Sequence, residues 1–213
     1  MMKVVLFLVC TGMLQAVDET PAEALRRLVA GNERYSEERL EHPNRGHEER
    51  LASAEGQTPF AAIVGCSDSR VSPEILFDQG IGDLFIVRVA GNVVGSVEMD
   101  SVDYAAVHLK ASLVLVLGHQ SCGAVQAVMQ GKTEGIEAVA DLMAPSISSS
   151  KSVEQAVKEN VLYSVAEIKK SAGLKGLIEA GKLDVIGGYY NFQTGKVEIL
   201  KPKLLGVSQE DRP

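Results

Sequence analysis

Short apolar runs alternate along the chain with longer segments whose apolar residues recur at helical spacing. Continuous apolar runs of this length are typical of strands buried on both faces of a parallel sheet. They cover residues 60–65, 84–89, 113–118 and 183–187. A fifth run at 197–200 closely follows Gly195 and is expected to be an antiparallel edge strand. The pattern predicts one α/β domain with a mostly parallel central sheet flanked by helices.

The first helix is predicted to begin after Thr20. Thr20 is a good N-cap, Pro21 suits the first helical position, and Glu23 completes a capping box. Gly31 and Asn32 are expected to interrupt or end this helix.

Residues 37–50 are highly charged and are expected to form a solvated loop. The loop contains His42 and His47, but neither has a cysteine or carboxylate in a metal-binding arrangement. A second metal site is therefore not favoured there.

Further helices are predicted between and after the apolar runs. One covers residues 97–108 and turns inward its apolar positions Val102, Ala105, Ala106 and Leu109. Two shorter helices lie near 125–130 and 135–143, and Pro145 with the serines at 148–150 is expected to break the chain. A long amphipathic helix follows, with one apolar face made of Val153, Val157, Val161, Val165 and Ile168.

Metal-binding residue types follow two of the apolar runs. Cys66 comes directly after the first run, and His119 and Cys122 come after the third. Ligands of open parallel sheets gather at the carboxyl ends of the strands, so these side chains are expected to converge. Two thiolates and an imidazole suit Zn²⁺, and three protein ligands leave one position open, as in catalytic sites. Two alternatives remain: cysteines that only pack in the core, and a Cys66–Cys122 disulfide.

A carboxylate and a guanidinium stand beside the first cysteine. Arg70 can hold Asp68 with a two-pronged, charge-assisted contact and keep it ionised. Neither packing cysteines nor a disulfide accounts for such a pair. The pair therefore favours a metal site with an open position.

Residues 1–16 are predicted to be a signal peptide, and residues 17–213 the mature domain. Lys3 precedes a largely apolar stretch at 4–14 that is too short to span a bilayer, and Ala16 ends a weak small-residue cleavage site. The prediction is a periplasmic or secreted protein without a stable membrane anchor. Cys10 would leave with the signal peptide. The alternatives are a buried N-terminal element, or a misassigned start codon that leaves the protein cytoplasmic.

The charge balance argues against one class of partner. The net charge is −7, with 21 Lys and Arg residues dispersed among 28 Asp and Glu residues. A nucleic-acid-binding surface needs a basic stripe, which this pattern does not provide. Nucleic acid is therefore not an expected partner.

At its metal-binding residues the chain resembles the β-class carbonic anhydrases. Their signature pairs Cys-x-Asp-x-Arg with His-x-x-Cys, and both motifs are present at 66–70 and 119–122. The similarity also includes residues 24–28, 88–92 and 188–191. The resemblance implies a zinc lyase in which Cys66, His119 and Cys122 bind Zn²⁺. It further implies reversible hydration of carbon dioxide to bicarbonate and a proton, by attack of hydroxide on the zinc.

The resemblance also implies roles for other residues. Asp68 would orient the zinc hydroxide and, in part of the family, become a fourth zinc ligand, while Arg70 holds it. The substrate site would be lined by Gln57, Phe85, Ala90, Tyr104 and Gly123.

Family members assemble as homodimers or dimers of dimers, with an N-terminal helical arm that embraces the partner. Because the family places Gln57 and Tyr104 of one site on different subunits, a dimer would be necessary for activity.

Two alternative functions remain. Relatives with the same zinc motif hydrolyse carbon disulfide or carbonyl sulfide, and access to the pocket rather than the ligand set separates them. A zinc-stabilised interaction module without turnover is the other. The Asp68–Arg70 pair argues against the second alternative, because a structural zinc has no use for a held carboxylate.

Overall fold

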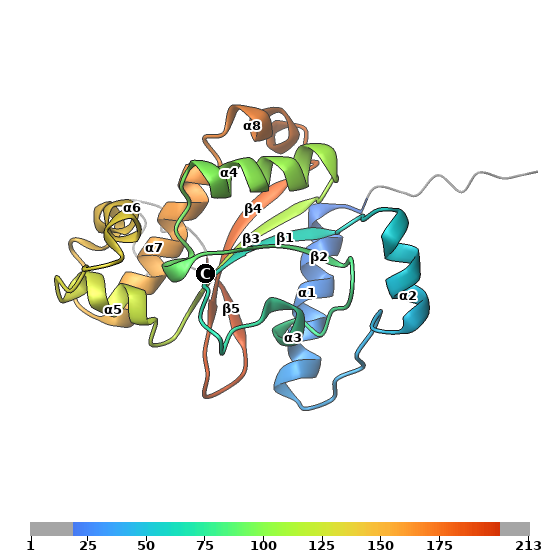
Figure 1. Ribbon diagram of the computed structural model, residues 1–213, viewed down its shortest axis with the longest axis horizontal. Helices are drawn as coiled ribbons and strands as arrows, with labels where there is room; N and C mark the ends of the chain where they lie inside the picture. The colour runs from blue at the N-terminus through green and yellow to red at the C-terminus, as the bar shows by residue number, and fades with distance from the viewer. Residues whose placement is uncertain (1–18, 201–213) are drawn as a thin grey trace, which may run out of the picture.

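The computed structural model describes residues 19–200, and these residues contain a single five-stranded sheet. The strand order is β2-β1-β3-β4-β5 (Figure 1). The strands are β1 (Ala61–Gly65), β2 (Leu84–Arg88), β3 (Leu113–His119), β4 (Asp184–Tyr190) and β5 (Val197–Leu200). The first four pair in parallel and β5 pairs antiparallel with β4. The predicted fold class and the antiparallel edge strand are confirmed.

The sheet lies between helices on both faces. All residues of β1 and β3 are buried, as expected for strands covered on both sides. Helix α7 (Val153–Ile168) packs on one face so closely that a Cβ at Gly118 or Gly187 would lie 2.6 or 2.7 Å from the Val161 side chain. Helix α1 (Pro21–Ser36) lies on the other face, as Figure 1 shows. The predicted amphipathic character of α7 is confirmed, since Val157, Val161, Val165 and Ile168 are buried.

The predicted start of α1 is confirmed, but its predicted interruption is wrong. Thr20 caps the helix and Glu23 completes the capping box. The helix runs through Gly31 and Asn32 to Ser36 because both residues serve tertiary contacts. A Cβ on Gly31 would lie 1.8 Å from the Phe77 carbonyl oxygen, so only glycine fits. The Asn32 side chain donates to two backbone carbonyls, those of Leu76 and Gly195.

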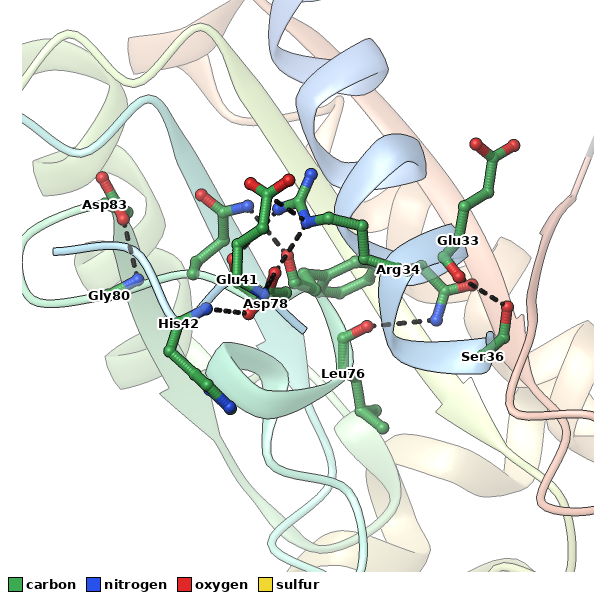
Figure 2. Close-up of polar contacts among 12 residues, drawn as sticks. Glu33, Arg34, Ser36, Glu41, His42, Leu76, Asp78, Gly80 and Asp83 are labelled. Atoms are coloured by element: carbon green, nitrogen blue, oxygen red, sulfur yellow. Dashed lines mark hydrogen bonds and ion pairs between the residues drawn. The ribbon is translucent and has the colours of Figure 1, made fainter. Parts of the chain in front are cut away.

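The charged segment after α1 is only partly the predicted loop. Its residues are mostly exposed, but His47–Ala52 forms the short helix α2, followed by the 3₁₀ turn η1 (Ser53–Glu55). The loop part is tied to the domain by Asp78, which is fully buried. Its carboxylate accepts hydrogen bonds from Arg34 of α1 and from the backbone N–H groups of Glu41 and His42 (Figure 2).

The remaining helices match the prediction in part. Helix α4 (Ser96–Asp103) continues as a π-helical turn, η3 (Tyr104–His108). Its predicted inward residues Val102, Ala105 and Ala106 are buried, whereas the fourth, Leu109, is only half buried. Pro145 lies inside α6 (Glu137–Ile147) rather than at a break, and the helix ends two residues after it. Helix α8 (Ala172–Glu179) is not predicted by the sequence pattern. The short helices α3 (Pro73–Leu76) and η2 (Ala90–Asn92) are also not predicted, whereas α5 (Gly123–Met129) corresponds to the helix expected near 125–130.

Candidate metal centre and active site

Three predicted metal ligands meet at the carboxyl ends of two neighbouring strands. Cys66 directly follows β1, His119 is the last residue of β3, and Cys122 is the N-cap of α5. Gly65 pairs with Leu117, so the parallel register places the two strand ends side by side. The ligand atoms of the three residues all lie within 4.8 Å of one another. Their exposed fractions are 4%, 0% and 1%, so the cluster is shielded from water.

The cluster has the donor set that a metal ion needs. Both cysteines are free thiols, so the alternative of a Cys66–Cys122 disulfide is wrong for this structure. His119 Nδ1 lies 3.0 Å from the Gln120 carbonyl oxygen and donates to it, which leaves Nε2 as an acceptor. Nε2 is buried, and it has no hydrogen-bond partner among residues 19–200. A buried unpaired nitrogen is costly, and a cation beside the two sulfurs would satisfy it.

The two cysteine sulfurs influence each other's ionisation. The neighbouring Cys122 thiol lowers the pKa of Cys66, and the Gly91 N–H bond to the Cys66 sulfur adds to this effect. The neighbouring Cys66 and burial raise the pKa of Cys122. A divalent cation would stabilise both thiolates, since thiols that coordinate a metal lose their protons.

Asp68 is held beside the cluster by Arg70. The guanidinium donates through Nε and Nη2 to the two carboxylate oxygens, at 2.9 and 2.7 Å, and the Arg70 backbone N–H adds a third bond at 3.0 Å. These bonds, chiefly the side-chain ones, hold the pKa of Asp68 well below its usual range. Asp68 Oδ2 lies 3.8 Å from His119 Nε2. The carboxylate is therefore ionised, adjacent to the metal ligands, and engaged with Arg70.

Two residues near the cluster are not identified as site residues by the sequence. Arg88 donates to the carbonyl oxygens of Cys66 and Asp68, at 2.8 and 2.5 Å, and so fixes the backbone that carries them. Phe192 lies against both Arg70 and His119. Arg88 stands at the start of the family-like segment 88–92, which is the only signal in the sequence that could have indicated it.

The expected substrate residues fall into two groups. Ala90 lies in η2, next to Gly91, whose N–H reaches the Cys66 sulfur. Gly123 follows Cys122, and a Cβ built on it would meet nothing within 4 Å. These two residues therefore adjoin the cluster, and Gly123 faces open space.

The second group lies at the other end of the strands. Phe85 pairs with Ala62, four residues before Cys66, which corresponds to about 13 Å along the strand. Its ring lies 6.1 Å from that of Tyr104, and Tyr104 is 48% exposed. Gln57 is exposed in the segment that enters β1. Within one chain, the structure does not bring Phe85, Tyr104 and Gln57 to the metal cluster.

Fold and site together define an α/β metalloenzyme. A buried cysteine–histidine–cysteine cluster lies at the carboxyl ends of parallel strands, where such folds bind their ligands. Three protein ligands with a carboxylate held beside them by Arg70 are typical of a catalytic metal centre, whereas a structural metal site has four protein ligands.

Comparison with known proteins identifies the family. The profile of the carbonic anhydrase family matches residues 61–197. Carbonic anhydrase 2 of Mycobacterium tuberculosis is 35% identical over 202 residues, covering 89% of this chain and 97% of that protein. The carbonic anhydrase of Mycolicibacterium smegmatis is also 35% identical, over 194 residues that cover 85% and 94% of the two chains. This chain belongs to the β-class carbonic anhydrases.

Solved structures agree with this assignment. The β-carbonic anhydrase CafA of Aspergillus fumigatus superimposes with a TM-score of 0.65 at 26% identity, over 84% of this chain and 90% of that one. The Coccomyxa β-carbonic anhydrase, solved with acetazolamide, gives a TM-score of 0.58 at 29% identity, over 70% and 75%. The similarity therefore extends from sequence motifs to the arrangement of the whole domain.

Proposed function

We propose that the metal of this carbonic anhydrase is zinc, held by Cys66, His119 and Cys122. The observation that carries the proposal is the buried, unpartnered Nε2 of His119 beside two thiols whose sulfurs lie within ligand reach. Thiolate and imidazole together suit zinc, whereas oxygen ligands would suit magnesium or calcium. Three protein ligands leave the fourth position open for chemistry.

The reaction that this site supports is the reversible hydration of carbon dioxide to bicarbonate and a proton. Bound zinc would supply acidity, making hydroxide available near neutral pH to attack the carbon. The ionised Asp68 can only accept hydrogen bonds, so it would orient the O–H group of the nucleophile. Arg70 keeps Asp68 ionised and fixes its plane.

A dimer would complete the substrate site. Phe85 and Tyr104 lie far from the cluster of their own chain, on β2 and η3. β2 ends the sheet among residues 19–200, and its residues Leu84–Ile86 are only half buried. Val97 and Val107, on the adjoining α4 and η3, are 71% and 45% exposed. A second copy that covers this face would bring its own Phe85 and Tyr104 to the site.

The direct test is stopped-flow CO₂ hydration with zinc-loaded protein, followed by removal of the metal with a chelator and its replacement. We expect one zinc per chain, loss of activity with the metal, and recovery on adding zinc. Cys66→Ser and Cys122→Ser should lose metal and activity together. Full activity without metal would refute the zinc site, and hydrolysis of carbon disulfide or carbonyl sulfide without CO₂ hydration would favour that alternative substrate.

We also propose export, with cleavage after residue 16. The predicted signal peptide lies outside the described residues, and the support for it is the basic start and the short apolar stretch. None of the helices between residues 19 and 200 combines the length and apolar character that crossing a membrane requires. Mass spectrometry of the protein from its native host should find a chain that starts near Val17 and lacks Cys10. Recovery from the cytoplasm of chains that begin at Met1 would refute export.

A further inference from the structure

The ring of Phe192 lies between a metal ligand and the arginine that holds the carboxylate. The guanidinium carbon of Arg70 stands over this ring, 4.5 Å from its centroid. The His119 ring meets it edge-on at 5.8 Å, and the Tyr190 ring does so at 5.1 Å. Phe192 is half buried and lies just after the end of β4.

The Arg70 guanidinium pairs with Asp68 through two bonds but is open to water. Its side chain is 53% exposed, whereas that of Asp68 is 17% exposed. Water competes with an exposed ion pair, and ordering a long side chain costs rotamer freedom. A ring face under the guanidinium adds an attraction that does not compete with the carboxylate for N–H donors. Asp68 and Phe192 therefore fix the guanidinium plane together.

The backbone fixes Phe192 relative to the metal ligands. The Phe192 N–H donates to the Gln120 side-chain oxygen at 3.1 Å, and the Gln120 N–H donates to the Tyr190 carbonyl oxygen at 2.8 Å. Gln120 directly follows His119, so the ring and the imidazole share one short piece of backbone support. A ring held in this way can determine where Arg70 lies.

We propose that Phe192 is a positioning residue that holds Arg70 against Asp68. The inference rests on the proposed function, in which Asp68 orients the nucleophile. Without the ring, Arg70 samples other rotamers and the carboxylate loses its two-pronged partner. Asp68 Oδ2 lies 3.8 Å from His119 Nε2, so a released carboxylate would be free to bind a cation that His119 holds. Phe192 thereby keeps Asp68 an acceptor for the nucleophile rather than a ligand of the metal.

The first measurement concerns the contact itself and starts from the wild type. In zinc-loaded wild type, the Arg70 Nε–H in a ¹⁵N NMR spectrum should be protected from exchange, because its bond to Asp68 is held in place. Phe192→Leu should remove this protection, whereas Phe192→Tyr, which keeps a ring, should retain it. Equal protection of the Arg70 Nε–H in wild type and Phe192→Leu would overturn the proposal, whatever the activity.

The second measurement is a double-mutant cycle on kcat/KM. Phe192→Leu should lower kcat/KM by about two- to five-fold at pH 7.5, with zinc affinity unchanged. Phe192→Tyr should restore most of that loss, and in the Arg70→Ala background Phe192→Leu should have no further effect. An equal loss in both backgrounds would show that the ring acts through His119 packing and would overturn the proposal.

A matched control variant tests whether the effect on Arg70 is specific to Phe192, and the wild-type rate of CO₂ hydration tests the proposed function. Phe60→Leu removes a ring from under another guanidinium, that of Arg27 at 3.7 Å, at the opposite end of β1. It should leave the Arg70 signal unchanged, and a change there would count against a local role of Phe192. A wild type that binds zinc but does not hydrate CO₂ would refute the proposed function, while the NMR result still tests the contact itself.

Discussion

The backbone N–H of Gly91 donates a hydrogen bond to the sulfur of Cys66, at 3.3 Å. Helix α7 holds the donor in place, because the side chain of Asn160 donates to the Gly91 carbonyl oxygen at 2.7 Å and Ser164 donates to the Asn92 carbonyl oxygen at 3.2 Å. A hydrogen bond from an outer-shell donor stabilises a thiolate and orients it for a metal, and the loss of such a partner lowers metal affinity. Two buried polar residues of α7 thus support the predicted metal ligand Cys66, because they hold the backbone segment that donates to its sulfur.

Gly91→Ala should weaken both folding and metal binding. Gly91 has a φ of 71°, and an added Cβ would lie 2.4 Å from the Met143 side chain. We expect a loss of about 1–3 kcal/mol in unfolding free energy from strain, and weaker zinc affinity because the N–H···S bond is displaced. Urea unfolding and chelator competition measure the two effects.

The control for this variant is a glycine inside an α-helix. A Cβ added at Gly176 in α8 would meet nothing within 4 Å, and this glycine has no positive φ. Gly176→Ala should leave zinc affinity unchanged and leave stability equal or about 0.5–1 kcal/mol higher. Equal zinc affinity in wild type and Gly91→Ala would show that the contact with Cys66 does not matter for the metal.

Asp68→Asn should lower the rate without moving its pH dependence. The pKa of Asp68 lies well below its usual range, so Asp68 is ionised throughout the working pH. We expect kcat/KM to rise through about pH 7–8.5, and we assign this rise to the nucleophile rather than to Asp68. We expect kcat/KM about 100-fold lower with zinc retained, since an orienting acceptor is lost.

Stopped-flow rates between pH 6 and 9 check this expectation. Asp103→Asn, which changes a carboxylate that accepts from Ser171, is the matched control and should keep the wild-type profile. A flat wild-type profile, with Asp68→Asn as fast as wild type, would leave Asp68 without a role in the reaction.

The strands and the meeting of the metal ligands could be predicted from local sequence patterns. Contacts between segments that lie far apart in the sequence could not. The strands and the convergence of Cys66, His119 and Cys122 follow from apolar runs and from the rule that parallel strands end together. The continuation of α1 through Gly31 depends on a carbonyl of Phe77, 46 residues away, that no local pattern shows. Phe192 likewise becomes a site residue only because β4 ends beside β3.

Asp78→Ala should destabilise the domain severely. The Asp78 carboxylate is fully buried and accepts from Arg34 at 2.6 Å and from the N–H groups of Glu41 and His42, each at 3.0 Å (Figure 2). Removing one partner of a buried ion pair leaves the other uncompensated, at a cost of about 3–5 kcal/mol. Glu167→Gln, in an exposed pair with Lys170, should cost about 0.5 kcal/mol or less in the same urea titration.

The buried carboxylate of Asp78 should also make the unfolding free energy depend on pH. Burial would raise the pKa of Asp78, but the Arg34 side chain and the two backbone N–H groups outweigh burial and lower it. A lowered pKa means stability that is present above the unfolded value of about 3.9 and is lost as pH falls below it. Wild type should therefore lose unfolding free energy below about pH 4 more steeply than Asp78→Asn. Parallel acid titrations of the two proteins would contradict this assignment.

A complementation experiment tests whether the two subunits share a site. Asp68→Asn keeps the metal ligands and Tyr104 but lacks the orienting carboxylate, whereas Tyr104→Ala keeps the carboxylate and lacks the exposed ring. If Tyr104 serves the partner's metal centre, a heterodimer of the two variants contains one complete site. Random re-association after mixing should then restore about a quarter of wild-type activity, because half of the dimers are mixed and each has one complete site of two. Each variant taken alone through the same steps is the control. No recovery, with mixed dimers demonstrated by mass spectrometry, would show that Tyr104 does not act across the interface.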